Sequence, residues 1–148
     1  MILTDNENAP PPADWAAQLL TFWFDQHGMD DWYGGGPDFD AEVRALAEGW
    51  HETLRALPAE TFLTDPDTAL AATILFDQVP RNLFRGHADA FATDDLARAI
   101  ARVIVAQGWD QGWSDDRRQF AYLPLEHSEE IADQRQSLRL MGPPAAPL

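Results

Sequence analysis

The sequence predicts an all-α protein, an antiparallel bundle or array of helices, and three features of the chain support this class. Apolar residues recur three and four positions apart along six segments, which is the period of one face of an α-helix. Hydroxyl and acidic residues precede most of these segments and Gly or Pro follows them, as at helix ends. No segment alternates apolar and polar residues as a half-buried strand does. We therefore expect a single helical domain at residues 14–141, with a flexible lead at 1–13 and a disordered tail at 142–148.

The first two helices are expected on either side of a glycine-rich loop at residues 29–38. The first helix covers residues 15–27, with Asp14 as its N-cap residue and Gly28 ending it. Its buried face consists of Leu19, Leu20, Trp23 and Phe24. The second helix carries a single apolar stripe at helical spacing and is closed by Pro58. That stripe consists of Phe39, Val43, Leu46, Trp50 and Leu54.

The third helix is expected to be the central buried one. It begins near Asp65, Pro66 and Asp67, because acidic residues and proline suit a helix N-terminus. Its body, ALAATILF, is apolar on every face, and a helix of that kind is surrounded by protein. Pro80 lacks a backbone N–H and should kink or end this helix.

Three further helices complete the predicted array. One begins at Thr93, and its buried face consists of Leu96, Ile100, Val103 and Ile104. A turn at residues 108–113 leads to a short helix over residues 114–124, which Pro124 ends. The last helix covers residues 128–141.

Composition and charge exclude several classes of function. The 148 residues include no Cys and no Lys, so disulfides, thiolate zinc sites, a Cys nucleophile and a Lys Schiff base are ruled out. The formal net charge of −15 repels phosphate backbones, which argues against nucleic-acid binding. The longest apolar runs fall short of the roughly 20 residues that span a bilayer, and the first residues do not resemble a secretory signal. We expect a cytoplasmic protein that contacts no membrane.

The histidines do not indicate a metal site. The four His residues form no close helical ligand pair, and the H-E-x-x-H pattern is absent. Carboxylate-bound Mg²⁺ or Ca²⁺ stays open among the 25 acidic residues, although no EF-hand loop is present. We assign no metal and no cofactor.

A first cluster of unexpected polar residues lies in LFDQVPRNLFRG, at the end of the most apolar helix. Asp77, Arg81 and Arg85 are spaced four apart and share one face if the helix continues. Arg offers a planar fork of donors that suits a carboxylate or a phosphate group. Gln78 and Asn82 belong to the same stretch. Two interpretations stay open, namely a structural ion pair that holds the helix end and a ligand site.

A second cluster lies in YLPLEHSEE, at the start of the last helix. His127 stands between Glu126 and Glu129 there, and a histidine oriented by a carboxylate can act as a general acid or base. The alternative is an ordinary surface histidine beside a helix start. Trp32 and Tyr33, on the glycine-rich loop, are an aromatic pair that could wall a ligand pocket.

Several strings of the chain together resemble a bacterial family catalogued as domain of unknown function 924. They are LLTFWF, WY, PDFDAEVRAL, LFDQVPRNLFRG, ADAFATDDLA and YLPLEHSEEIADQRQSLRL, and they extend over residues 15–140. The resemblance implies a tetratricopeptide-like helical array, and it marks both polar clusters as family signatures without naming a reaction. Typical members continue into a basic, aromatic helical segment, whereas this chain ends in GPPAAPL, so the resemblance implies a more open site.

Two hypotheses of function follow. In the first, a pocket between the third and last helices binds a small anionic or polar ligand, with Arg81 and Arg85 holding an anion and His127 as an acid–base group. Its residues are Asp77, Gln78, Arg81, Asn82, Arg85, Glu126, Trp32 and Tyr33 for the ligand, with His127 and Glu129 for catalysis. In the second, the array is a noncatalytic scaffold that presents a concave surface to a peptide, with a preference for basic peptides. Whether the protein is an enzyme stays open.

The last helix also predicts a surface for self-association. Its apolar residues are Ile131, Leu138, Leu140 and Met141. Only part of this set can pack inward on the preceding helices, and contiguous exposed apolar surface usually marks an interface. A symmetric homodimer is the most common way to bury such a surface.

Overall fold

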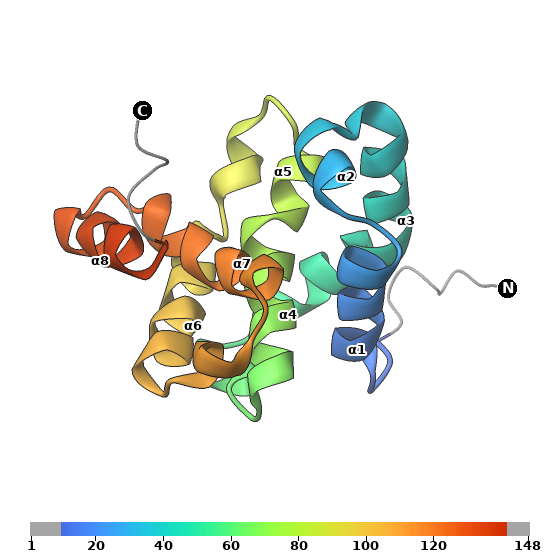
Figure 1. Ribbon diagram of the computed structural model, residues 1–148. Helices are drawn as coiled ribbons and strands as arrows, with labels where there is room; N and C mark the ends of the chain where they lie inside the picture. The colour runs from blue at the N-terminus through green and yellow to red at the C-terminus, as the bar shows by residue number, and fades with distance from the viewer. Residues whose placement is uncertain (1–9, 142–148) are drawn as a thin grey trace, which may run out of the picture.

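All regular structure in the described part of the chain is helical (Figure 1). A computed structural model describes residues 10–141. The helices are α1 (Trp15–Leu20), α2 (Met29–Gly34), α3 (Gly36–Leu54), α4 (Pro66–Asp77), α5 (Val79–Leu83), α6 (Asp94–Ala106), α7 (Asp115–Glu126) and α8 (Ile131–Met141). A π-helical turn, Thr21–Asp25, continues α1, and 3₁₀ turns lie at Ala59–Phe62, Ala88–Phe91 and Trp109–Gly112. No helix in residues 10–141 combines the length and the apolar character needed to cross a membrane.

The predicted all-α class and helical array are confirmed by these elements. The tetratricopeptide-like arrangement that the resemblance implies stays a prediction. So do the flexible lead and the disordered tail, because residues 1–9 and 142–148 lie outside the described residues.

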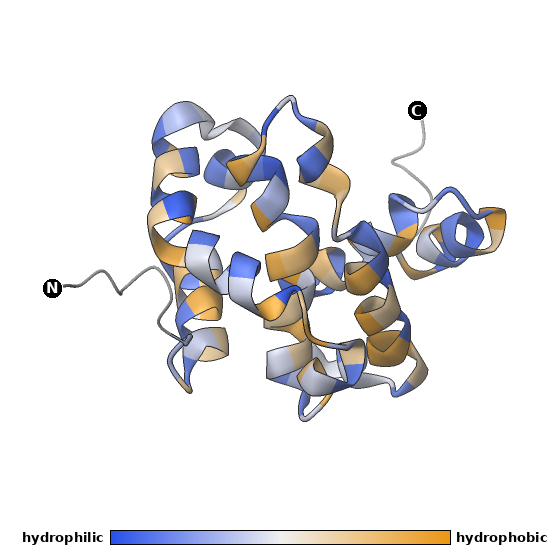
Figure 2. Ribbon diagram, turned by 180° about the vertical axis from the view of Figure 1, so that it is seen from behind, coloured by the Kyte–Doolittle hydropathy of each residue, from blue (hydrophilic) through white to orange (hydrophobic). Residues whose placement is uncertain are grey.

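Helix α4 is the central helix, as predicted, and its residues 69–77 are all buried. It packs against α1, α6 and α7, and α5 follows it directly (Figure 1). The surrounding helices carry both hydrophobic and hydrophilic bands in Figure 2, as helices with one buried face do. The last buried residue of α4 is Asp77, a charged group in an apolar setting that needs polar partners.

The predicted boundaries of α4 are confirmed at both ends. The Oδ1 atom of Asp65 accepts a hydrogen bond from the backbone N–H of Thr68 at 2.8 Å, which is the expected N-cap. The helix ends at Asp77, and α5 begins at Val79. Pro80 lies in the first turn of α5, where a helix needs no donor from its backbone.

Two other predicted helix starts are correct in position and wrong in the capping group. Helix α1 follows Asp14, but that carboxylate accepts a bond from the side chain of Gln18 at 2.9 Å and caps no backbone N–H. Helix α6 follows Thr93, whose hydroxyl donates instead to the Phe76 carbonyl at 2.7 Å. That carbonyl belongs to the last turn of α4 and needs a donor from outside its own helix.

The predicted loop at residues 29–38 is wrong except at Gly35, because residues 29–34 form helix α2 and residues 36–38 begin helix α3. The indole N–H of Trp32 donates to the Trp23 carbonyl at 3.0 Å, and its ring packs edge-on against Phe120. These contacts hold a glycine-rich segment as a helix, because tertiary packing overrides local propensity. The joint with α3 does need glycine, since Gly36 has a φ of 68° in the left-handed region.

Pro124 does not end α7, contrary to prediction. A proline inside a helix removes one backbone hydrogen bond, but the N–H of His127 still reaches the Leu123 carbonyl at 2.9 Å. Helical geometry therefore extends to His127, which has a φ of −77° and a ψ of −8°. The last helix correspondingly begins at Ile131 rather than at Ser128.

Candidate functional site

The two predicted polar clusters meet at the C-terminal end of α4. Asp77 is only 1% exposed there, and His127 lies at the end of α7. The Oδ1 atom of Asp77 is 3.0 Å from Nδ1 of His127, and its Oδ2 atom accepts a hydrogen bond from Gln78 Nε2 at 2.8 Å. Because a carboxylate only accepts hydrogen bonds, Nδ1 of His127 carries the hydrogen and Nε2 is the basic nitrogen.

Arg81 ties this pair to helix α6. Its guanidinium group donates to both carboxylate oxygens of Asp94, at 3.0 and 3.2 Å. The same group lies 3.4 Å from Asp77 Oδ1, donates to the Asp77 backbone carbonyl, and sits 5.2 Å from the ring centroid of Phe91. The cluster contains two carboxylates, one guanidinium and one imidazole, so a proton accepted by His127 would complete its charge balance.

Arg85 and Asn82 form a separate cluster with helix α3. Arg85 donates to the two carboxylate oxygens of Asp40 at 2.9 and 2.8 Å, and Asn82 donates to Asp40 Oδ1 at 2.8 Å. The bonds from Arg85 and Asn82 hold the pKa of Asp40 below its ordinary 3.8. Because Arg85 lies beyond the end of α5, only Asp77 and Arg81 form the expected common face.

The turn that carries His127 is anchored by its neighbour in the chain. Ser128 is buried, and its hydroxyl donates to Asp133 Oδ2 at 2.7 Å. Arg102 of α6 donates to the same carboxylate at 2.5 Å. Burial acts to raise the pKa of Asp133, but the hydrogen bonds from Arg102 and Ser128 hold this pKa below its ordinary 3.8. The chain therefore leaves α7 in a fixed direction.

The outer side of His127 is open. Its side chain is 27% exposed, and no hydrogen bond to its Nε2 comes from residues 10–141. Glu129, the second predicted catalytic residue, is exposed and forms no hydrogen bond or ion pair with the described residues. The structure therefore brings His127 to Asp77, Gln78 and Arg81, and leaves Glu129 apart from them.

A pocket of about 560 Å³ runs along α7 and includes two of the predicted ligand residues, Tyr33 and Glu126. It is lined by Tyr33, Asp115, Arg118, Gln119, Tyr122, Leu123, Glu126 and Leu140. Trp32 does not line it, because its ring packs against Trp23 and Phe120 in the core. We call this cavity the α7 pocket.

A larger groove of about 970 Å³ lies between α3 and the end of α5. Its apolar lining includes Leu46, Trp50, Leu83 and Phe84, together with Ala45 and with Pro10 and Pro12 from the segment before α1. His51 also lines it, is 1% exposed, and has its Nε2 3.2 Å from the hydroxyl of Thr93. Since that hydroxyl already donates to the Phe76 carbonyl, Nε2 of His51 is the donor. Burial lowers the pKa of His51 to about 4.

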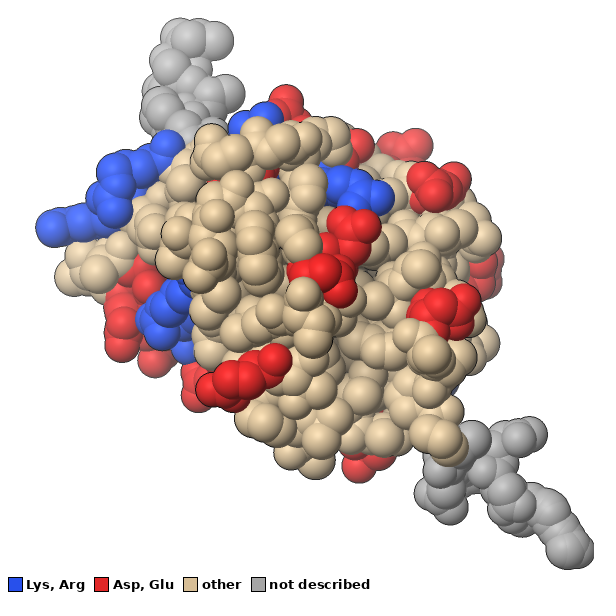
Figure 3. Space-filling view, turned by 90° about the horizontal axis from the view of Figure 1, so that it is seen from below, with Lys and Arg blue, Asp and Glu red and all other residues tan. Residues whose placement is uncertain are grey.

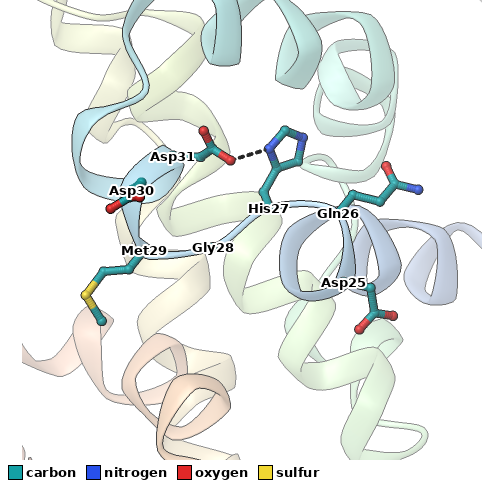
Figure 4. A pocket seen from close by; sticks show the side chains of 7 residues that line it. All are labelled: Asp25, Gln26, His27, Gly28, Met29, Asp30 and Asp31. Carbon is teal, nitrogen blue, oxygen red and sulfur yellow. Dashed lines mark hydrogen bonds and ion pairs between the residues drawn. The ribbon is translucent and has the colours of Figure 1, made fainter.

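A third, smaller pocket of about 320 Å³ is lined by residues 25–31 (Figure 4). The imidazole of His27 meets Asp31 Oδ2 at 2.7 Å, whereas Asp25 and Asp30 point away from it. Within the described part of the chain, no three His, Asp or Glu side chains converge in a way that could hold a metal ion.

The carboxylates that pair with the two arginines, Asp94 and Asp40, are not among the predicted site residues. Asp94 lies in the string ADAFATDDLA and Asp40 in PDFDAEVRAL, so both stand in segments that carry the family resemblance. A search of those strings for acids able to partner Arg81 and Arg85 would have proposed them. Gln119 and Tyr122 of the α7 pocket had no such signal, because they look like ordinary residues of a short helix.

Comparison with known proteins gives a family and a fold. A family model described as "Bacterial protein of unknown function (DUF924)" matches residues 19–146. Among solved structures, the chain is similar to one titled "Structure of Protein of Unknown Function ATU0120 from Agrobacterium tumefaciens", with 37% sequence identity and a TM-score of 0.80. That match covers 86% of this chain and 72% of that chain. No curated protein matches the chain.

Proposed function

The chain belongs to the DUF924 family of bacterial proteins of unknown function, and we propose that it binds a small polar ligand beside His127, where the Asp77–His127 pair acts as an acid–base group. The 3.0 Å contact between His127 Nδ1 and the buried carboxylate of Asp77 carries this proposal. A histidine held in this way presents its other nitrogen, Nε2, for proton transfer.

The pair has the parts that acid–base chemistry requires. Asp77 fixes the orientation and the tautomer of the imidazole. When Nε2 accepts a proton from an O–H or N–H group of the ligand, the resulting imidazolium is stabilised by the adjacent carboxylate. Gln78 and Arg81 in turn hold the carboxylate, so little reorganisation is needed when the charge appears.

The arginines support a polar ligand better than an anionic one. Arg81 and Arg85 are already engaged in two-bond pairs, with Asp94 and Asp40 respectively. An anion would have to displace one of these carboxylates. The net charge of −15 opposes the approach of an anion, and acidic residues are spread across the face shown in Figure 3. Arg81 is then a residue that positions Asp77.

A noncatalytic scaffold is the second candidate, and the groove between α3 and α5 favours it. Its aliphatic and aromatic lining suits the side chains of a peptide. Glu52 on the same groove would suit a basic residue of that peptide, whereas Glu48 is already paired with Arg44. Peptide binding at this groove would not depend on His127. The two candidates therefore differ in their response to a substitution at His127.

The test is the tautomer of His127 in the full-length protein. Long-range ¹H–¹⁵N correlations of the imidazole rings should show His127 with its hydrogen on Nδ1, and Asp77→Asn should change this population. Asp38→Asn, at an exposed carboxyl on α3, is the matched control and should change nothing. In a screen of small polar substrates, any activity should be lost with His127→Asn and kept with His87→Asn. A hydrogen on Nε2 in the unmodified protein would overturn the acid–base role.

A further inference from the structure

We infer that the α7 pocket binds a small ligand that carries a positively charged amine, and that it holds this ligand beside His127. This inference rests on the proposed function, because it names the ligand class of the same site. Three features of the pocket support it, namely its continuity with His127, its unbalanced negative charge and its aromatic wall.

The wall of the pocket is a single face of α7, whose last lining residue, Glu126, directly precedes His127 in the chain. The α7 residues that line it are Asp115, Arg118, Gln119, Tyr122, Leu123 and Glu126, which follow one another at spacings of three, one, three, one and three. Residues at such spacings share one helical face. Since helical geometry extends to His127, this residue lies one turn beyond Leu123, about 6 Å along the axis. A ligand of ordinary metabolite size in a cavity of about 560 Å³ can therefore extend from the pocket toward His127.

The charge of the pocket is negative and is not balanced internally. The lining contains two carboxylates, those of Asp115 and Glu126, and one cation, Arg118. The Nε atom of Arg118 donates to the Trp113 carbonyl at 2.9 Å, and its Nη2 lies 3.9 Å from Asp115. Glu126 forms no ion pair with any described residue. An ammonium group would provide the missing partner for Glu126.

Tyr33 supports the same ligand from the opposite wall. Its hydroxyl donates to Gln119 Oε1, which holds the ring against α7, and 58% of the residue is exposed. A phenol ring attracts a cation to its face. Partial burial of its hydroxyl and then the carboxylates of Glu126 and Asp116 raise the pKa of Tyr33 above its ordinary 10.0, as expected where the potential is negative.

The test is a titration of the ¹⁵N-labelled full chain with three probes at constant ionic strength: ethylammonium, tetramethylammonium and acetate. We expect both cations to shift the amide signals of Gln119, Leu123 and Glu126 saturably, with little response to acetate. Glu126→Gln should weaken binding of both cations by about two- to fivefold, the range expected for one solvent-accessible ion pair. The control Glu60→Gln removes another exposed carboxylate, from a 3₁₀ turn that does not line the pocket, and should leave binding unchanged.

Three results would overturn the inference. The first is acetate binding at the same signals with higher affinity than the cations, which would assign the pocket to an anion on Arg118. The second is an equal effect of Glu126→Gln and Glu60→Gln on cation binding. The third is the absence of a saturable shift with either cation. The tautomer of His127, measured in the same unmodified protein, separates this inference from the proposed function. Cation binding that persists while the Nδ1 tautomer is absent from the unmodified protein would contradict the acid–base role alone.

Discussion

The imidazole of His127 and the carboxylate of Asp77 meet at 3.0 Å although 50 residues separate them in the chain. The contact exists because α7 crosses the end of the buried helix α4, and Pro80 ends that helix with a carboxylate inside the protein. An apolar residue at position 77 would satisfy the packing. Burying the carboxylate of Asp77 costs free energy unless its polar partners Gln78, Arg81 and His127 are all present. This cluster is therefore the clearest target for substitution.

Asp77 and Arg81 should prove energetically coupled. Asp77→Ala leaves Arg81 and His127 without a shared acceptor and should reduce the free energy of unfolding by about 3–5 kcal/mol. Arg81→Ala should also destabilise, and the double variant should lose less than the sum of the two single losses. Urea denaturation followed by circular dichroism measures all three values. The control pair is Arg98 with Asp95, whose carboxylate is 95% exposed and whose coupling should stay below about 1 kcal/mol. Additive losses at Asp77 and Arg81 would contradict the coupling.

His51 should make the protein less stable as the pH falls from about 6.5 to about 4. Burial, with a smaller contribution from Arg55, lowers the pKa of His51 from 6.5 to about 4. In that window the unfolded chain binds a proton that the folded chain rejects, so the free energy of unfolding falls by up to about 3 kcal/mol. The lowered pKa values of Asp40, Asp65 and Asp133 reduce the free energy of unfolding mainly below about pH 5, at the acid end of this window and beyond it.

The measurement is urea denaturation across this pH range. His51→Gln should remove most of the slope whatever its stability at neutral pH, whereas the exposed-residue control His87→Gln should keep it. Equal slopes in the unmodified protein and His51→Gln would contradict the assignment.

Helix α8 should mediate self-association. Ile131 and Leu138 are 64% and 54% exposed, and they lie seven residues apart on the same side of the helix. Pairing of two copies would bury both residues, and salt should strengthen it by screening the net charge of −15. Sedimentation at low and moderate salt should therefore show a dimer that Leu138→Glu weakens. Leu57→Glu, at an exposed leucine outside α8, is the control. A monomer under both conditions would contradict the prediction.

Much of the fold was predictable because its signals are local. The stripe of α3, the all-apolar body of α4, the N-cap at Asp65 and the break at Pro80 each depend on residues within one helix. The wrong predictions concern features that depend on contacts between segments far apart in the chain. Helix α2 forms because Trp32 packs against Trp23 and Phe120, and these contacts are invisible in a glycine-rich string.

The same distinction, between signals within one segment and contacts between helices, applies to the candidate site. The i, i+4 spacing of Asp77 and Arg81 and the unusual string around His127 marked residues that the structure brings together, since both patterns lie within short segments of chain. Only the packing of α4, α6 and α7 decided that Arg81 binds Asp94 and that His127 reaches Asp77, and only the packing of α3 against α5 decided that Arg85 binds Asp40. Hydrophobic periodicity specifies which face of each helix is buried, but it carries no information on how far one helix is shifted or rotated against another. Those two quantities set which charged side chains come within hydrogen-bond distance, and they depend on the packing of all the helices at once.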